Sequence, residues 1–170
     1  EVHEFGVCSP EVIDAVRKNA KVKFATSRKN MLQFKEFACL IMNIKEAMEN
    51  KIRSAFGFTN GLNVKDLIIT HAGEGAIAYP YDKPLINVKS QELTENIDPC
   101  GCGDMFYAIY SSSVMAGYDT ITCLQLANSG ARCVARKLFG TGQADCDEIV
   151  KEWEFLYGEK KGVDKSTTNE

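Results

Sequence analysis

The chain has 170 residues, of which 45% are hydrophobic and 25% are charged, as is typical of a single soluble globular domain. Twenty Lys and Arg residues against 23 Asp and Glu give a formal net charge of -3, which argues against a nucleic-acid partner. The longest apolar run, residues 37–42, is too short to cross a bilayer, so we expect no membrane partner.

The seven cysteines are odd in number and follow no regular spacing. This pattern predicts reduced thiols in a cytoplasmic protein rather than a disulfide framework, and the opening residues show no signal-peptide pattern. Cys100 and Cys102 are separated by one residue, and no second pair stands at zinc-finger spacing. A metal or redox site at these two thiols remains an alternative interpretation.

The first predicted element is a helix introduced by Ser9 and Pro10, because serine is a good N-cap and proline fits the first helical position. Its apolar face would consist of Val12, Ile13 and Val16. Strand patterns then follow at residues 22–26, 38–42, 67–70, 76–79 and 85–88.

Helices dominate the rest of the chain. Residues 104–116 and 120–138 predict two helices, ended by Gly117 and Gly140, and Asp145 with Glu148 has the capping-box spacing that opens a third. Strands alternating with helices, followed by helices alone, predict a layered α/β domain over residues 1–157. The polar residues 158–170 are expected to form a disordered tail.

Residues 98–104 stand directly before the helix predicted at 104–116. Gly101 and Gly103 allow a tight turn with converging amides, and the positive end of the helix dipole points to the same place. This arrangement suits a phosphate or the charge that develops in phosphoryl transfer. Asp104 would repel a phosphate but could accept the proton of an attacking hydroxyl. A plain turn with an aspartate N-cap explains the same residues.

Four segments, taken in chain order, favour the phosphate site over the plain turn. Residues 40–47, 67–76, 98–104 and 127–131 resemble, in turn, the K-P-N-x-x-E-A, T-x-G-x-x-G-A and D-T-x-G-A-G-D segments and the adenine-side helix of ribokinase/PfkB-type sugar kinases. The resemblance implies a ribokinase-like fold. It also implies that Asp104 is the catalytic base and that the backbone of Gly101, Cys102 and Gly103 forms the anion hole.

The same resemblance assigns the remaining site residues. Asn43 and Glu46 would order Mg²⁺ and its waters. ATP would bind by Thr70, Gly73, Gly75 and Asn128. Residues 5–10 and 137–142 further resemble the heptose-7-phosphate kinase branch of the family. The chain departs from the family pattern at several positions, among them Pro99, Cys100 and Cys102.

The resemblance covers nearly all of this chain but only the latter half of a typical member, whose first half supplies much of the sugar pocket and part of the sheet. We therefore expect a fragment, or a chain that associates through an open sheet edge, for example as a homo-oligomer. The first hypothesis is an ATP-dependent kinase acting on a hydroxyl of a sugar or sugar phosphate. The alternative is a non-catalytic nucleotide-binding or assembly module that keeps the kinase fold.

Overall fold

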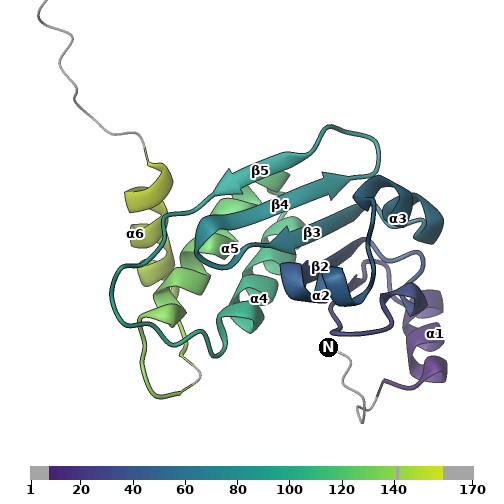
Figure 1. The fold of residues 1–170 in the computed structure, drawn as a ribbon, viewed down its shortest axis with the longest axis horizontal. Helices are drawn as coiled ribbons and strands as arrows, with labels where there is room; N and C mark the ends of the chain where they lie inside the picture. Colours follow the sequence, from purple (N-terminus) through teal and green to yellow (C-terminus); the bar gives the residue numbers. More distant parts are fainter. Residues whose placement is uncertain (1–7, 141, 159–170) are drawn as a thin grey trace, which may run out of the picture.

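A five-stranded sheet forms the centre of the computed structural model, which describes residues 8–140 and 142–158 (Figure 1). The strand order is β1-β2-β3-β4-β5, with β1, β2 and β3 parallel and β4 and β5 antiparallel to their neighbours. The strands are β1 Phe24–Ala25, β2 Cys39–Asn43, β3 Asp66–Thr70, β4 Gly75–Pro80 and β5 Ile86–Lys89. Each predicted strand is therefore present, within one or two residues at most ends.

Helices cover both faces of this sheet, so the predicted layered α/β class is confirmed. The α-helices are α1 Pro10–Asn19, α2 Ile44–Glu49, α3 Ala55–Leu62, α4 Cys102–Met115, α5 Thr120–Ala135 and α6 Cys146–Tyr157. Two short 3-10 turns are η1 Met31–Gln33 and η2 Ala72–Glu74. Figure 1 shows α4 and α5 behind the sheet and α6 at the left of them, while α1, α2 and α3 gather on the side of β2 and β3.

The two apolar layers follow from the alternation of side chains along each strand. Leu40 and Leu67 belong to the cluster that packs under α1, α2 and α3. Ile41 and Ile68, the next residue in each strand, belong to the cluster that includes Phe106 of α4. Both central strands are thus buried on both faces, as their continuous apolar sequences predict.

Helix α1 begins where the sequence predicts, since the Ser9 side chain accepts a hydrogen bond from the Val12 amide. Its predicted apolar face is partly wrong. Ile13 is buried, but Val12 and Val16 are each 41% exposed. The face that α1 turns to the sheet is therefore narrower than the valine and isoleucine pattern indicates, and the two valines lie on its border with solvent.

Two other helical predictions need correction. Helix α5 ends at Ala135 rather than at 138, so Gly140 does not cap it. Helix α3 was not predicted, although Ser54 caps it by accepting from the Gly57 amide. Helix α6 begins at the predicted capping box, where Asp145 and Glu148 bond to each other's backbone amides. The tail predicted at residues 158–170 lies outside the described residues from 159 onward.

In the parts of the chain that the structure describes, no helix is both long and apolar enough to span a membrane. All seven cysteines fall within these parts, and each is a free thiol. Across the same residues, no group of three or more His, Cys, Asp or Glu side chains is arranged to hold a metal ion. The alternative of a metal site at Cys100 and Cys102 therefore has no geometric support.

Candidate active site

A cavity of about 240 Å³ lies where the turn after β3 meets the start of α4 and one side of α5. Its walls come from three parts of the chain: the turn between β3 and β4, the segment that joins β5 to α4, and the facing sides of α4 and α5. Among its lining residues are these predicted site residues: Thr70, Gly73, Gly75, Cys102, Gly103 and Asn128. Residues predicted from three separate motifs thus share one cavity.

One end of this cavity is the N-terminus of α4. Gly101 is the N-cap with a φ of 81°, in the left-handed region that glycine adopts freely, and no side chain caps the helix. The amides of Gly103 and Asp104 in the first turn have no acceptor among the described residues. A Cβ placed on Gly103 would meet no atom within 4 Å. The helix start is therefore open, with backbone donors available to an anion.

Cys102 stands between the two glycines and lines the cavity. Burial raises the pKa of the Cys102 thiol, and the nearby Asp98 carboxylate and Cys100 raise it further. The thiol therefore stays neutral and adds no negative charge at the helix start. Its replacement of the small residue usual in the family leaves the backbone donors in place.

The turn after β3 requires glycine at position 75. Gly75 has a φ of 111°, and a Cβ there would lie 2.2 Å from the Val88 carbonyl oxygen and 2.8 Å from the Ser90 amide nitrogen. The backbone of β5 thus approaches this turn too closely for any side chain. The Ser90 amide donates to the Glu74 carbonyl, which fixes the turn against the end of β5.

Asn128 is buried on α5 and lines the cavity. Its Nδ2 donates to the Val88 carbonyl at 3.3 Å and to the Tyr157 hydroxyl at 3.2 Å. The amide group is therefore held in one orientation by β5 and α6. Asn128 is a fixed part of the wall, and both hydrogen bonds of its amino group are made within the protein.

Arg132 lies one turn beyond Asn128 on α5 and also lines the cavity. Its Nε donates to Glu152 Oε1 at 2.6 Å, and Glu152 Oε2 accepts from Arg136 Nη1 at 2.6 Å. Burial alone would raise the pKa of Glu152, but hydrogen bonds from the two arginines outweigh it and lower the pKa. Sequence analysis missed this pair because Arg132 and Glu152 are far apart in the chain and on different helices.

Three buried side-chain polar atoms lack hydrogen-bond partners within residues 8–140 and 142–158: Arg132 Nη1, Ser90 Oγ and His71 Nε2. Arg132 and Ser90 line the cavity, and His71 is the chain neighbour of the lining residue Thr70. Buried donors and acceptors are nearly always paired in native proteins. These three atoms are exceptions to that rule on or beside the cavity wall.

The predicted metal ligands, Asn43 and Glu46, do not line this cavity. Asn43 and Glu46 form a capping box at the start of α2, with the Asn43 amide donating to Glu46 Oε2 at 2.8 Å and the Glu46 amide donating to Asn43 Oδ1 at 2.9 Å. Asn43 pairs in register with Thr70, so it stands beside the cavity without lining it. Mg²⁺ in kinases is held mainly by phosphates and water with one or two carboxylates, so Glu46 fits a role through its second oxygen.

Asp104 opens onto a second hollow, of about 320 Å³, on the β1 side of α4. This hollow is lined by residues of α4 and by the β1 strand and its exit: Phe24, Ala25, Thr26, Asp104, Tyr107, Ala108 and Ser111. Asp104 is exposed. The consecutive residues Gly103 and Asp104 therefore line two different hollows, one on each side of the start of α4.

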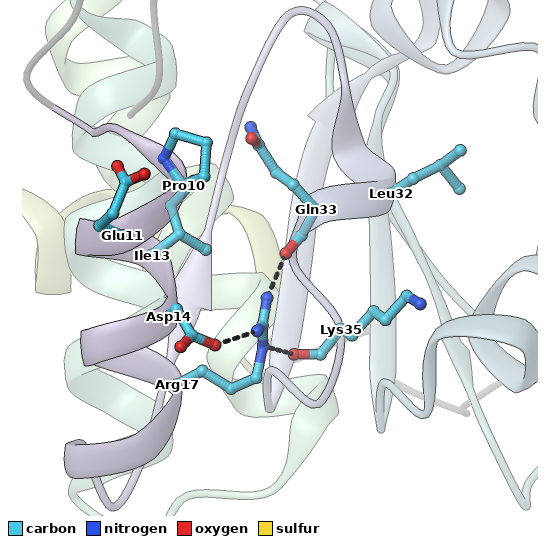
Figure 2. Close-up of a pocket in the computed structure, with 8 residues that line it drawn as sticks. All are labelled: Pro10, Glu11, Ile13, Asp14, Arg17, Leu32, Gln33 and Lys35. Carbon is cyan, nitrogen blue, oxygen red and sulfur yellow. Dashed lines mark hydrogen bonds and ion pairs between the residues drawn. The ribbon is translucent and has the colours of Figure 1, made fainter.

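A third hollow, of about 490 Å³, lies between α1 and residues 32–35 (Figure 2). Figure 2 shows Arg17 at its floor, where the guanidinium donates to Asp14 and to the carbonyls of Gln33 and Lys35. None of the predicted site residues lines this hollow. Its arginine is fully engaged in tying α1 to the neighbouring segment, which is a structural role.

Residues 33–144 match the model of the pfkB family carbohydrate kinases. The match covers more than half of the chain and includes the cavity, the start of α4 and all of α5. The chain belongs to the pfkB carbohydrate kinase family. A search of curated proteins returned no match.

Solved structures of this family share the fold. A nucleoside kinase of Methanocaldococcus jannaschii is 24% identical, with a TM-score of 0.72 over 86% of this chain and 54% of that one. An Arabidopsis thaliana ribokinase, solved with ribose and ATP, is 16% identical, with a TM-score of 0.70 over 86% of this chain and 52% of that one. The phosphofructokinase-2 of Escherichia coli is 14% identical, with a TM-score of 0.75 over 86% of this chain and 51% of that one.

This pfkB chain thus spans about half the length of the solved structures that it matches. The matches include nucleoside, ribose and fructose-phosphate kinases, so they point to no particular branch. Assignment to the heptose-7-phosphate kinase branch therefore stays a prediction, and two of the segments that suggested it reach residues 5–7 and 141, outside the described part of the chain.

Proposed function

We propose that this chain holds the nucleotide site and the catalytic base of an ATP-dependent kinase that phosphorylates a hydroxyl of a sugar or sugar phosphate. The observation that carries the proposal is the placement of Gly103 and Asp104 on two hollows that meet at the start of α4. Phosphoryl transfer needs the donor and the acceptor on opposite sides of the transferred group, in line with each other. The start of α4 provides one hollow for each.

The cavity that contains Gly103 is the proposed donor site. ATP supplies the phosphoryl group when bound, and Mg²⁺ near Glu46 would offset the charge of its phosphates. The free amides at the start of α4 would bind the phosphoryl oxygens and stabilise the charge that develops on them. The Gly75 turn and Asn128 would both form part of the wall around the nucleotide.

The hollow that contains Asp104 is the proposed acceptor site. The acceptor hydroxyl oxygen would bond to the γ-phosphorus while the bond from that phosphorus to the ADP oxygen breaks, and the hydroxyl proton would pass to the Asp104 carboxylate. The products would be a phosphate ester, ADP and a protonated base. Asp104 is exposed, so its carboxylate can reach a substrate without rearrangement of α4. Only residues of β1, its exit and α4 line this hollow within the described residues.

The alternative is a nucleotide-binding or assembly module without turnover. The observation that favours it is that the acceptor hollow is lined only by β1, its exit and α4 within the described residues. An experiment on Asp104 separates the two. Asp104→Asn should lower phosphotransfer to a sugar by about 10³-fold, because the base is lost, and leave the Kd for ATP with Mg²⁺ unchanged. Asp82→Asn, a change at an exposed loop carboxylate, is the matched control and should behave as wild type.

Transfer is measured as ADP formed in the presence of ribose, fructose 6-phosphate, a heptose 7-phosphate or a nucleoside. Equal turnover by Asp104→Asn and wild type would contradict the assignment of the base. Tight ATP binding by the wild type with no transfer to any of these acceptors would favour the binding module.

A further inference from the structure

The side chains of α4 that line the acceptor hollow all lie on one face of the helix. They occupy positions i, i+3, i+4 and i+7 and so form a single row: Asp104, Tyr107, Ala108 and Ser111. The rest of the lining comes from β1 and its exit, residues 24–26. An acceptor in this hollow would therefore touch two parts of the chain, and transfer needs those two parts at a fixed separation.

Tyr107 joins this face of α4 to the sheet. Its hydroxyl donates to the Ile41 carbonyl of β2 at 2.5 Å, across 66 positions of sequence. Its half-buried ring packs against the apolar cluster between the sheet and α4. The hydroxyls of Ser111 and Ser112, by contrast, donate to carbonyls of α4 itself. Since α4 packs chiefly against α5, the Tyr107 hydroxyl provides a direct bond from the lining of the hollow to β2.

Strand β2 also holds the other part of the lining. The last pair of the β1–β2 ladder is Ala25 with Leu40. Ile41 is the next residue of β2, so Tyr107 bonds to this strand directly beyond the ladder. Both parts of the lining are thus fastened to consecutive residues of one strand, which fixes where α4 stands relative to β1.

This position matters for the proposed base. Asp104 lies one turn before Tyr107 on the same face of α4 and is exposed, so the place of its carboxylate depends on the place of the helix. An acceptor hydroxyl must lie within hydrogen-bond reach of its base. A shift of α4 away from β1 would separate an acceptor held by β1 and its exit from Asp104, and small misplacements of reacting groups slow catalysis strongly.

Resting on the proposed function, we infer that Tyr107 is a positioning residue that holds Asp104 against the acceptor by bonding α4 to β2. It acts through Asp104 and exchanges no proton with the substrate, because its hydroxyl hydrogen is bonded to the Ile41 carbonyl.

The test is steady-state kinetics of Tyr107→Phe with ATP, Mg²⁺ and whichever of ribose, fructose 6-phosphate, a heptose 7-phosphate or a nucleoside the wild type phosphorylates fastest. Phenylalanine keeps the ring and removes only the hydroxyl, so the chain should stay folded. We expect kcat to fall about tenfold, while the acceptor KM and the Kd for ATP stay within about twofold of wild type. The calorimetric stoichiometry of ATP binding reports the folded fraction of each protein.

Ser112→Ala is the matched control. It also removes a hydroxyl that donates to a carbonyl on α4, but Ser112 is exposed and does not line the hollow. Its kcat should equal that of the wild type.

A double-mutant cycle with Asp104→Asn tests whether Tyr107 acts through the base. In the Asp104→Asn background, Tyr107→Phe should change kcat by less than about twofold, because no base remains to be positioned. A further tenfold loss in that background would overturn the inference, since the effect would then be independent of Asp104. A single variant Tyr107→Phe with wild-type kcat, or with an equal loss of ATP affinity, would overturn it as well.

Failure of the proposed function gives a different result. If the folded wild type phosphorylates none of the four acceptors, the kinase proposal is refuted and the inference falls with it. If the wild type phosphorylates one of them and Tyr107→Phe does so equally fast, the kinase proposal stands and only the role of Tyr107 is lost.

Discussion

The two edges of the sheet differ in how they end. At the β5 edge, the Tyr157 hydroxyl of α6 donates to the Lys89 carbonyl at 2.9 Å, and Asn128 of α5 donates to the Val88 carbonyl. At the other edge, β1 has two residues and pairs only with β2 in the part of the chain that the structure describes. Side chains close one edge, and the other is left open.

The two hollows at the start of α4 also differ, in how many parts of the chain line them. The donor cavity lies on the β5 side and has walls from the glycine turn, the β5–α4 segment and two helices. The acceptor hollow lies on the β1 side and is lined by β1, its exit and α4 alone. Within the described residues, the cavity on the β5 side is lined by several parts of the chain, while the hollow on the β1 side is lined by only two. Association through the β1 edge stays a prediction.

The largest expected loss of stability comes from a substitution at Gly75, in the turn beside the closed edge. Gly75→Ala would force a Cβ to within 2.2 Å of a backbone oxygen at a φ of 111°, so we expect a loss of about 4 kcal/mol or failure to fold. Gly130→Ala is the contrasting change, because its Cβ would meet side-chain atoms alone, chiefly the tip of Ile109 at 2.0 Å, with Met105 Cγ at 3.3 Å. The Ile109 side chain can move, so the cost should be about 2 kcal/mol. Urea unfolding of the two variants measures both losses of unfolding free energy.

Removing the carboxylate that joins α5 to α6 should be the next largest effect. Glu152→Gln leaves the buried Arg132 without its counter-charge, and we expect a loss of about 3 kcal/mol at pH 7. The folded-state pKa of Glu152 is lowered from its ordinary value of 4.5. Its contribution is therefore present above pH 4.5 and is lost as the pH falls through the lowered pKa.

Urea unfolding at a series of pH values tests this account of Glu152. The difference in unfolding free energy between wild type and Glu152→Gln should be constant above pH 5 and shrink below pH 4.5. A difference that stays constant down to pH 3 would contradict a stabilising ionised carboxylate.

A smaller effect is expected where α6 closes the β5 edge. Tyr157→Phe removes the donor to Lys89 and the acceptor for Asn128, at a cost of about 1 kcal/mol. Tyr118→Phe, a hydroxyl loss at a tyrosine that is 58% exposed, is the control and should change stability very little. Because Asn128 loses a partner on the cavity wall, Tyr157→Phe should also weaken nucleotide binding, which calorimetry would detect.

The smallest effect is expected beside the open edge. Val22, just before β1, is 44% exposed, so Val22→Ser should change the unfolding free energy by no more than about 0.5 kcal/mol. A cost above 2 kcal/mol, measured by urea unfolding, would mean that this edge is packed against another segment or another copy of the chain. The comparison of a closed and an open edge would then need revision.

Local patterns were sufficient for much of this fold. The caps at Ser9 and Asp145 and the apolar strands at 38–42 and 67–70 depend on neighbouring residues, and the structure has them where the sequence predicts. The exposure of Val12 and Val16 depends instead on how little of α1 the sheet can cover, which no local pattern reports.

The candidate site also has features that local motifs predict and features that they do not. Gly103 at the start of α4 and Gly73 and Gly75 after β3 were predicted from short motifs, and they share one cavity. The pairing of Arg132 with Glu152 joins two helices, and the separate hollows of Gly103 and Asp104 arise only from packing. Such long-range features cannot be predicted from spacing along the chain.

The central claim is that the start of α4 binds the phosphates of a nucleotide, and Gly103 offers the most direct test. A Cβ at this position meets no atom within 4 Å, so Gly103→Val should fold as well as wild type while its side chain fills the space before the free amides. In calorimetric titration with ATP and Mg²⁺, we expect saturable binding by the wild type and at least a hundredfold weaker binding by Gly103→Val, about 2.7 kcal/mol. Equal binding by the two folded proteins would contradict the claim, because the nucleotide would then bind elsewhere.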